Sequence, residues 1–203
     1  MTGRGTMADA AAERMMRRHL ADAIAVKQSM LEQSLPALVG IAGRLMAVLD
    51  RGGTIYLCGN GGSAADCQHV AAEFVGRFRR ERRPLPAVAL TTNTSALTAI
   101  GNDYSFEVVF SRQVAAAVTA DDAVVGISTS GGSPNVLAAI REATARQAAT
   151  VAFTGTPGEP LASLATQAFR APSSDTPRIQ ECHILAWHMV CDAIEETLAS
   201  RSP

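Results

Sequence analysis

The strongest indication of the fold is the stretch Thr54-Ile55-Tyr56-Leu57-Cys58-Gly59-Asn60-Gly61-Gly62-Ser63. Residues 54–58 are apolar or β-branched enough to form a buried strand, and the glycines that follow favour a tight loop. A helical pattern then runs from this loop to about residue 78. A strand that ends in a glycine-rich loop and leads into a helix is typical of a βαβ unit, which implies a parallel sheet.

The same alternation continues along the rest of the chain. Further strands are predicted at residues 86–91, 123–127, 150–153 and 167–170, and helices at residues 95–100, 106–118, 135–147, 160–164 and 177–198. This pattern predicts an α/β fold: one doubly wound domain whose parallel five-stranded sheet is covered by helices on both faces. In such sheets ligands bind at the carboxyl ends of the strands, where both glycine-containing loops of this chain fall.

Residues 8–50 are helical by pattern, because apolar residues recur at steps of three and four. Pro36 is expected to divide this stretch into two helices. We assign residues 1–50 to a helical N-terminal extension and residues 51–203 to the sheet domain. A long helical leader often packs against another subunit, so oligomerisation is predicted.

The composition is that of an ordinary soluble protein. Hydrophobic residues make up 47% and charged residues 18%, and the net charge of −1 gives no excess that would recruit nucleic acid or an acidic membrane. No apolar run has the length of a signal peptide or a membrane span. Cys58, Cys67, Cys182 and Cys191 form no C-x-x-C pair, which predicts reduced core thiols. These features predict a cytoplasmic protein that binds neither nucleic acid nor membrane.

Residues 59–64 also fit the dinucleotide fingerprint G-x-G-x-x-A. That fingerprint requires an acidic residue about 20 positions later, at the end of the second strand, to hold a ribose. Here the second predicted strand ends Leu90-Thr91-Thr92-Asn93, without a carboxylate. We therefore interpret the glycine loop as part of a site for a small phosphorylated substrate rather than for a dinucleotide.

A second loop follows the predicted strand at 123–127 and reads Ser128-Thr129-Ser130-Gly131-Gly132-Ser133-Pro134-Asn135. Backbone N–H groups at the start of a helix, together with hydroxyl groups, suit a phosphate monoester. A plain helix cap needs only one of the four hydroxyls, so phosphate binding is the favoured interpretation. No G-K-[ST] lysine is present, which excludes a Walker-type nucleotide loop.

Two pairs of side chains are candidates for the chemistry. His69 and Glu73 are four residues apart and lie on one face of the helix that follows the glycine loop. That spacing allows them to share a proton or a metal ion, although a solvated helical pair is the alternative. Gln180 and His188 are eight residues apart on the last helix, about 12 Å along its axis. If both serve one site, neighbouring subunits must contribute.

Arg77 lies one turn after Glu73 and is expected to contact either the phosphate or Glu73 itself. The basic run at residues 77–83 contains one aromatic residue and has no long basic face elsewhere, so we interpret it as a solvated loop. His183 is the competing histidine on the last helix and is interpreted as a packed or surface residue. His19 is interpreted as a surface residue.

With these residues in place, the chain resembles the phosphoheptose isomerases of the sugar isomerase (SIS) fold. The resemblance extends over nearly the whole chain and is carried by residues 57–66, 69–77, 99–104, 127–133 and 178–181. It implies an aldose-ketose isomerase that converts D-sedoheptulose 7-phosphate to D-glycero-D-manno-heptose 7-phosphate through a cis-enediol. That reaction is the first step of nucleotide-activated heptose biosynthesis.

The resemblance also implies a homotetramer with shared active sites and one zinc ion per subunit. The implied zinc ligands are His69, Glu73, Gln180 and His188. Glu73 is the implied catalytic base and His188 its acid/base partner. The implied substrate contacts are Asn60, Gly61, Gly62, Ser63, Glu73, Arg77, Asn102, Asp103, Ser128, Thr129, Ser130, Ser133 and Gln180.

An alternative from another class is a SIS-fold protein that binds partners without catalysing a reaction. One such group associates with the replication initiator DnaA and shares this length and tetrameric plan. Glu73 favours the isomerase, because a scaffold has no need of a carboxylate there. Since a zinc-bound carboxylate is a weaker base, the sequence leaves open whether Glu73 is base, ligand or both, and whether zinc is catalytic or structural. It also leaves open the downstream pathway and the product anomer.

Overall fold

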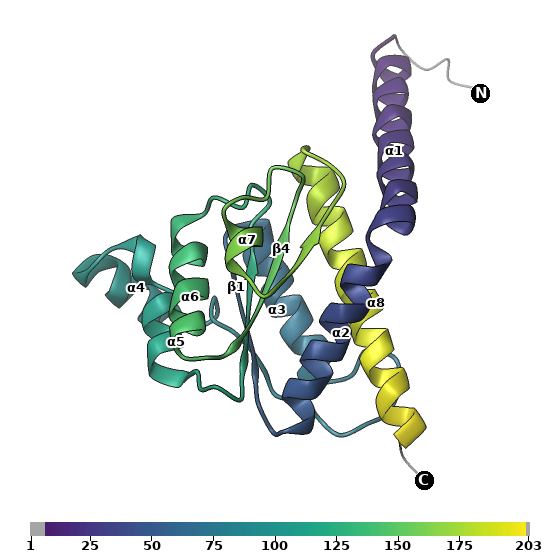
Figure 1. The fold of residues 1–203 in the computed structure, drawn as a ribbon. Coiled ribbons are helices and arrows are strands. Elements are labelled where there is room, and N and C mark those ends of the chain that lie inside the picture. The colour runs from purple at the N-terminus through teal and green to yellow at the C-terminus, as the bar shows by residue number, and fades with distance from the viewer. Residues whose placement is uncertain (1–6, 202–203) are drawn as a thin grey trace.

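The computed structural model describes residues 7–201 (Figure 1). Its strands are β1 (Ile55–Gly59), β2 (Ala87–Ala89), β3 (Ala123–Ile127), β4 (Ala149–Thr154) and β5 (Gln167–Arg170). Its α-helices are α1 (Met7–Gln33), α2 (Leu35–Asp50), α3 (Gly62–Val75), α4 (Thr94–Asp103), α5 (Ser111–Ala117), α6 (Pro134–Ala145), α7 (Leu161–Leu164) and α8 (Thr176–Arg201). A short 3-10 helix, η1 (Phe106–Val108), precedes α5. The α/β class predicted from the sequence is confirmed.

All five strands pair in parallel, in the order β2-β1-β3-β4-β5. Every residue of β3 is buried, because helices cover both faces of the sheet and the strand must be apolar on both sides. Strand β2 lies on one side of β1 and β3 on the other, so the direction of winding reverses between β1 and β3. The predicted parallel sheet is confirmed, and this reversal is where open α/β sheets bind ligands.

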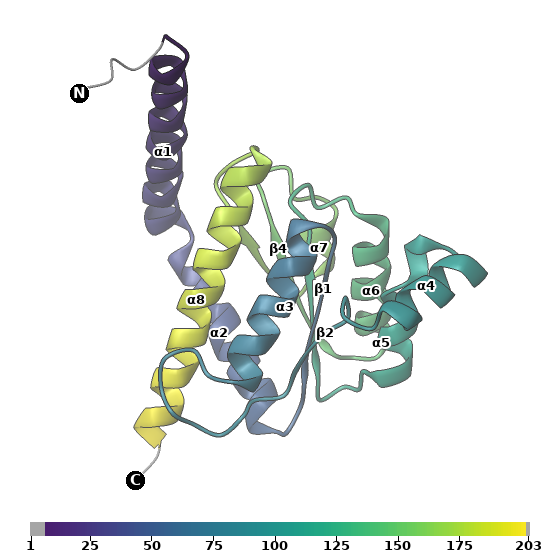
Figure 2. The same ribbon diagram turned by 180° about the vertical axis from the view of Figure 1, so that it is seen from behind.

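Different helices cover the two faces of the sheet (Figures 1 and 2). Helices α2, α3 and α8 pack on one face, around side chains that include Leu57 and Phe74. Helices α5, α6 and α7 pack on the other, around Val124 and Ile140 among others. Trp187 of α8 stacks on Phe153 of β4, with ring centroids 4.4 Å apart and planes at 10°. The sheet therefore fixes α3 and α8 beside each other on the same face.

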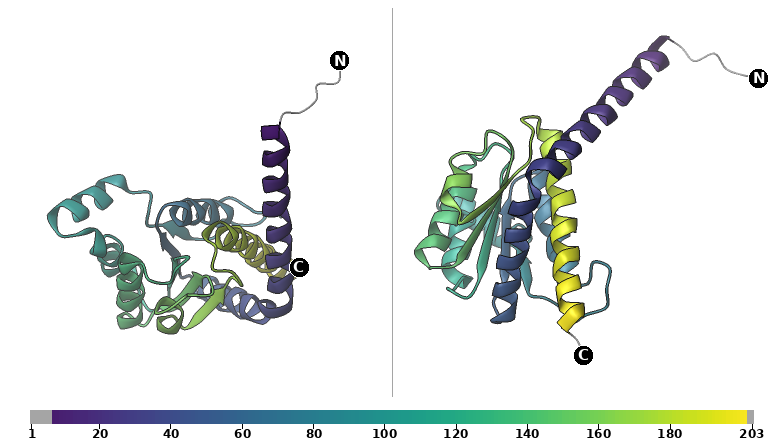
Figure 3. Two further views of the ribbon diagram at one scale, coloured as in Figure 1. Left: turned by 90° about the horizontal axis from the view of Figure 1, so that it is seen from above. Right: turned by 45° about the vertical axis from the view of Figure 1, so that its right-hand side comes forward.

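The two N-terminal helices meet at Ser34, just before Pro36, where the break was expected. Helix α2 packs into the core through Leu38, Ile41 and Leu45, although it belongs to the predicted extension. Helix α1 projects away from the body of the subunit (Figure 3). Its exposed large apolar side chains include those of Met15, Met16, Leu20, Ile24 and Leu31. Residues 1–6 of the predicted extension and residues 202–203 of the predicted sheet domain lie outside the described residues.

Several predicted boundaries differ from the structure. Strand β2 covers only three residues of the predicted 86–91, and the predicted helix at 106–118 is divided into η1 and α5, between which Val109 and Phe110 are buried. Helix α3 ends at Val75 rather than near residue 78, because the backbone amide of Phe78 donates to the carboxylate of Glu195. Helix α4 continues to Asp103, beyond the predicted end at residue 100.

The four cysteines are buried and free, as predicted from the sequence. Burial raises the pKa of Cys58 and of Cys191 to about 12. His183 is a packed residue whose Nε2 lies 3.1 Å from the carbonyl oxygen of Thr154, and burial lowers its pKa to about 4. His19 is exposed. No helix within residues 7–201 is both long and apolar enough to cross a lipid bilayer.

Candidate active site

Two loops lie side by side where the winding of the sheet reverses. The glycine loop, residues 59–63, connects β1 to α3, and the serine loop, residues 128–133, connects β3 to α6. Strands β1 and β3 pair in register up to Gly59 and Ile127, so both loops leave the same edge of the sheet. Asn60 Nδ2 donates to Asn135 Oδ1, and Asn135 Nδ2 donates to Asn60 Oδ1, each at 2.9 Å. This reciprocal pair fixes the spacing of the two loops.

Neither loop caps its helix with the side chain that precedes it. Gly61 precedes α3 with a φ of 55°, in the left-handed region that favours glycine, and has no side chain to offer. Ser133 precedes α6 and makes no capping hydrogen bond. The interpretation of the serine loop as a plain helix cap therefore loses its support. Two helix N-termini at one sheet edge favour an anion.

The hydroxyl groups of the serine loop differ in their accessibility. Ser128 is buried, and its Oγ lies 2.8 Å from the Oγ of half-buried Ser133. Ser130 is exposed, and its Oγ accepts a hydrogen bond from the Gly132 amide at 3.2 Å. Thr129 is half-buried. A hydroxyl that accepts one hydrogen bond still has its own O–H to donate, so Ser130 retains a donor for a phosphate oxygen.

The double substitution Ser130→Ala and Ser133→Ala is expected to raise KM for a sugar phosphate at least about ten-fold. Each hydroxyl lost removes a hydrogen bond to a charged group, which contributes about 1.5 kcal/mol or more. We expect a smaller change in kcat, because neither hydroxyl takes part in proton transfer. Initial rates over a range of substrate concentrations measure both constants, with Ser200→Ala near the end of α8 as the matched control. An unchanged KM would place the phosphate elsewhere.

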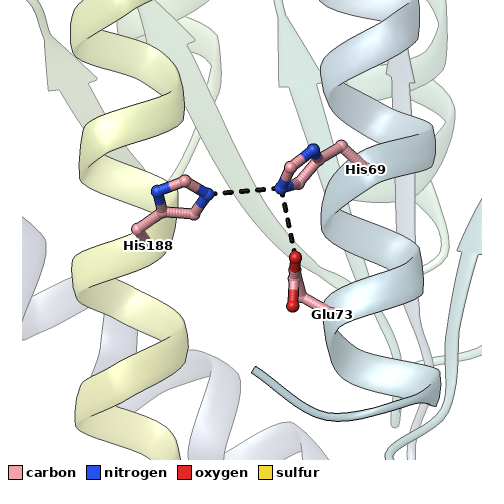
Figure 4. A group of neighbouring side chains, drawn as sticks. All are labelled: His69, Glu73 and His188. Atoms are coloured by element: carbon pink, nitrogen blue, oxygen red, sulfur yellow. Dashed lines mark hydrogen bonds and ion pairs between the residues drawn. The ribbon is translucent and has the colours of Figure 1, made fainter. Parts of the chain in front are cut away.

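A cluster of three side chains lies between α3 and α8 (Figure 4). His69 and Glu73 project from α3, and His188 projects toward them from α8. Nε2 of His69 lies 3.2 Å from Oε1 of Glu73 and 3.2 Å from Nε2 of His188. The potential ligand atoms of the three residues all lie within 4.8 Å of one another. The fold thus unites the predicted α3 pair with a histidine 119 residues away from His69.

The donor atoms of this cluster fit a zinc ion. Two imidazole nitrogens and a carboxylate oxygen are ligands that zinc prefers, and three protein ligands with an open position are typical of catalytic zinc. Tetrahedral bonds of about 2.0–2.1 Å separate neighbouring ligand atoms by about 3.4 Å, close to the two contacts of 3.2 Å that His69 makes. The side chains of His69 and Glu73 are 46% and 23% exposed, so a small ligand has access to the cluster.

Several of the predicted site residues lie away from this cluster within one subunit. Gln180 lies at the other end of α3, where a Cβ on Gly62 would collide with its amide group. Gly62 precedes His69 by seven residues, which corresponds to about 10 Å along the helix. Asn102 and Asp103 end α4, which has no buried residue and projects from the opposite side of the subunit (Figures 1 and 2).

Arg77 does not pair with Glu73, which was one of its two predicted contacts. Its Nε lies 3.9 Å from Oε2 of Glu81, and its Nη1 donates to the carbonyl oxygen of Arg79. The guanidinium that reaches Glu73 belongs to Arg82, whose Nη2 donates to the Glu73 carbonyl oxygen at 2.7 Å. The side chain of Arg77 is 58% exposed, so its contact with a phosphate stays a prediction.

Sequence patterns do not single out two further residues of this region, Asp66 and Asn135. Asp66 lies one turn before His69 on α3, and its Oδ2 is buried without a hydrogen-bond partner among residues 7–201. Burial raises the pKa of this carboxyl group. The three-residue spacing from His69 is the available signal. Asn135 has no comparable signal, since its role depends on Asn60 in another loop. Ser63, a predicted substrate contact, is buried.

Comparison with known proteins finds extensive similarity. A family model for the SIS domain matches residues 18–155. The phosphoheptose isomerase of Aquifex aeolicus (strain VF5) is 50% identical over 177 residues, which cover 87% of this chain and 93% of that protein. The phosphoheptose isomerase of Roseiflexus sp. (strain RS-1) is 54% identical over 175 residues, which cover 86% of this chain and 89% of that protein.

Solved structures show the same similarity. Phosphoheptose isomerase GmhA from Neisseria gonorrhoeae aligns with a TM-score of 0.85 and 45% identity, over 90% of this chain and 99% of that chain. A phosphoheptose isomerase from Francisella tularensis aligns with a TM-score of 0.88 and 34% identity, over 91% of this chain and 98% of that chain. The similarity therefore extends over nearly the whole length of these relatives.

Proposed function

The chain belongs to the phosphoheptose isomerases of the SIS-domain family, and we propose that the cluster of His69, Glu73 and His188 is its active site. It is an aldose-ketose isomerase that converts D-sedoheptulose 7-phosphate to D-glycero-D-manno-heptose 7-phosphate. The observation that carries the assignment of the site is the meeting of a carboxylate and an imidazole from α3 with a second imidazole from α8. This arrangement offers a base and an acid at one point.

The reaction moves a carbonyl group from C2 to C1 and requires two kinds of proton transfer. Glu73 takes the proton from one carbon, because a carboxylate can act as a general base. His188 exchanges a proton with the oxygens of the cis-enediol. His69 contacts both residues and holds them in a fixed relation. The glycine and serine loops bind the phosphate and hydroxyl groups of the heptose.

A zinc ion would be held by His69, Glu73 and His188, with Gln180 of the partner subunit as the expected fourth ligand. When bound there, zinc would supply a Lewis acid that polarises a carbonyl oxygen and stabilises negative charge on the substrate. We expect one ion per subunit, because residues 7–201 contain one such cluster. The residues of the chain still perform the proton transfers, orient the sugar and bind its phosphate.

We also propose a cytoplasmic homotetramer in which neighbouring subunits share active sites. Exposed apolar side chains along α1, and a projecting helix α4 without a buried residue, are surfaces that a second copy would cover. Gln180, Asn102 and Asp103 lie apart from the cluster of their own subunit, as expected if they complete the site of another. Four free, buried cysteines agree with a reducing compartment.

Shared sites predict a specific pattern of complementation between inactive variants. Glu73→Gln subunits mixed with Gln180→Ala subunits are expected to regain roughly a quarter of parental activity. Each shared site takes Glu73 from one subunit and Gln180 from another, and random pairing supplies both intact in about a quarter of the sites. Glu73→Gln mixed with His188→Gln is the control and is expected to stay inactive, since one subunit supplies both side chains. Mass spectrometry verifies subunit exchange. Failure of the first mixture despite exchange would contradict shared sites.

Conversion of D-sedoheptulose 7-phosphate by the purified protein, followed by NMR, tests the proposed function. We expect the aldose to form, and in D2O we expect deuterium to enter the carbon next to the carbonyl, because an enediol exchanges that proton with solvent. No turnover by folded protein supplied with zinc would overturn the assignment. The partner-binding alternative would then lead, although relatives that are named isomerases and the presence of Glu73 do not favour it.

A further inference from the structure

The segment between α3 and β2 is held against α8 by a buried carboxylate. The side chain of Glu195, near the end of α8, is only 1% exposed. Its oxygens accept hydrogen bonds from the backbone N–H groups of Phe78, Arg79 and Arg80, each at 2.8 Å. Burial by itself would raise the pKa of Glu195, but these three hydrogen bonds and the charge of Arg82 lower it. Glu195 is therefore ionised at neutral pH.

Arg82 joins this carboxylate to the end of α3. Its side chain is 7% exposed, and its Nε donates to Oε1 of Glu195 at 3.1 Å. Its Nη1 donates to the carbonyl oxygens of Phe74 and Gly76 at 2.9 and 3.1 Å, and its Nη2 to that of Glu73. One guanidinium thus satisfies carbonyl groups at the end of α3, where positive charge is favoured. We call Arg82 and Glu195 the α8 clamp.

Phe78 connects the α8 clamp to the active-site cluster. Its backbone N–H is fixed by Glu195, and its ring stacks on the imidazole of His188 with centroids 5.2 Å apart and planes at 27°. The α8 clamp therefore contacts Glu73 directly, at its carbonyl oxygen. It reaches His188 indirectly, through the ring of Phe78. No ligand or proton donor for the cluster comes from the side chains of Phe78, Arg82 and Glu195.

We propose that Arg82, Glu195 and Phe78 are positioning residues of the isomerase, which set the distance between Glu73 and His188 and the orientation of the His188 ring. This inference rests on the proposed function of the cluster. Stability alone explains the arrangement poorly, because a buried ion pair is costly to desolvate and contributes little net stability. Catalytic geometry gives a stronger reason, since reactive groups must be held to within about 0.5 Å by their surroundings.

Two substitutions of Phe78 separate positioning from folding. Phe78→Leu keeps the apolar volume but removes the flat ring, and it is expected to lower kcat about ten-fold and to raise the zinc dissociation constant about ten-fold. KM for D-sedoheptulose 7-phosphate is expected to stay within two-fold. Phe78→Tyr keeps the ring and is expected to retain parental values. Zinc affinity is measured by competition with a chromophoric chelator, which requires no turnover.

Substitution of the clamp itself is expected to act in the same direction. Glu195→Gln keeps the shape but removes the charge opposite Arg82, and we expect kcat and zinc affinity to fall about ten-fold. Glu196→Gln is the matched control: it lies on the same helix and pairs with Arg80, yet its side chain is 67% exposed. We expect parental values for this variant. Thermal unfolding shows whether each variant remains folded. If Glu195→Gln does not fold, the Phe78 variants still decide the test.

Parental kcat and zinc affinity in Phe78→Leu would overturn the proposal, and so would an equal loss in Phe78→Tyr, because the ring would then be irrelevant. If the parent protein binds zinc but does not convert the heptose phosphate, the proposed function fails and zinc affinity alone decides the role of the clamp. A parent protein that neither binds zinc nor turns over would overturn both.

Discussion

Replacement of Glu73 by glutamine is expected to lower kcat about a thousand-fold while the protein stays folded. Glutamine has the same shape as glutamate but cannot accept the proton from carbon, and a general base contributes about 10²–10⁴-fold to a rate. The backbone contact from Arg82 to residue 73 survives the substitution, so the end of α3 keeps its support. NMR in D2O measures the loss twice, as slower product formation and as slower exchange of the substrate proton.

The matched control for this variant is Glu142→Gln on α6, where the carboxylate pairs with Arg146 and has no contact with the cluster. We expect it to retain parental activity. Substantial turnover by Glu73→Gln would remove Glu73 as the base. His188 would then be the leading candidate, because it is the other group of the cluster that contacts His69.

Removal of bound metal by a chelator is expected to lower turnover more than about a hundred-fold, and added zinc to restore it, because a zinc ion held at the cluster would stabilise the charge that develops on the substrate oxygen. His69→Ala is expected to abolish both zinc binding and rescue. His183→Gln is the control, since His183 is buried against Thr154 and lies outside the cluster. If metal removal leaves turnover unchanged, the isomerase assignment stands, but zinc has no catalytic role.

The two experiments together address the double role expected of Glu73. A carboxylate bound to zinc is a weaker base, so either Glu73 would change its coordination during turnover or zinc would mainly organise the site. If Glu73→Gln loses turnover and zinc affinity together, the carboxylate is a ligand, and turnover that stays low at saturating zinc would show that it is also the base. If it loses turnover with unchanged zinc affinity, Glu73 is the base and His69 and His188 hold the ion with other ligands.

Local patterns in the sequence were sufficient for the parallel sheet and for the two loops. A buried parallel strand must be apolar on both faces, and its loop must contain residues that allow a sharp turn, so β1 and the glycine loop are recognisable within ten residues. The pair His69 and Glu73 was recognisable for the same reason, because helical spacing alone places both on one face. Element ends were less accurate: α3 stops at Val75 because of a carboxylate 120 residues further along the chain.

The sequence by itself therefore determined the fold class, the sheet edge that carries the site and the residue types available for acid–base chemistry. Only the tertiary structure decided that His188 meets His69 within one subunit while Gln180 does not, and that Asn135 binds Asn60. It also showed that Arg82 rather than Arg77 supports Glu73. The physical reason is the range of the interactions: strand and helix periodicity depends on neighbouring residues, whereas a contact between side chains of different elements depends on how the whole sheet packs those elements together.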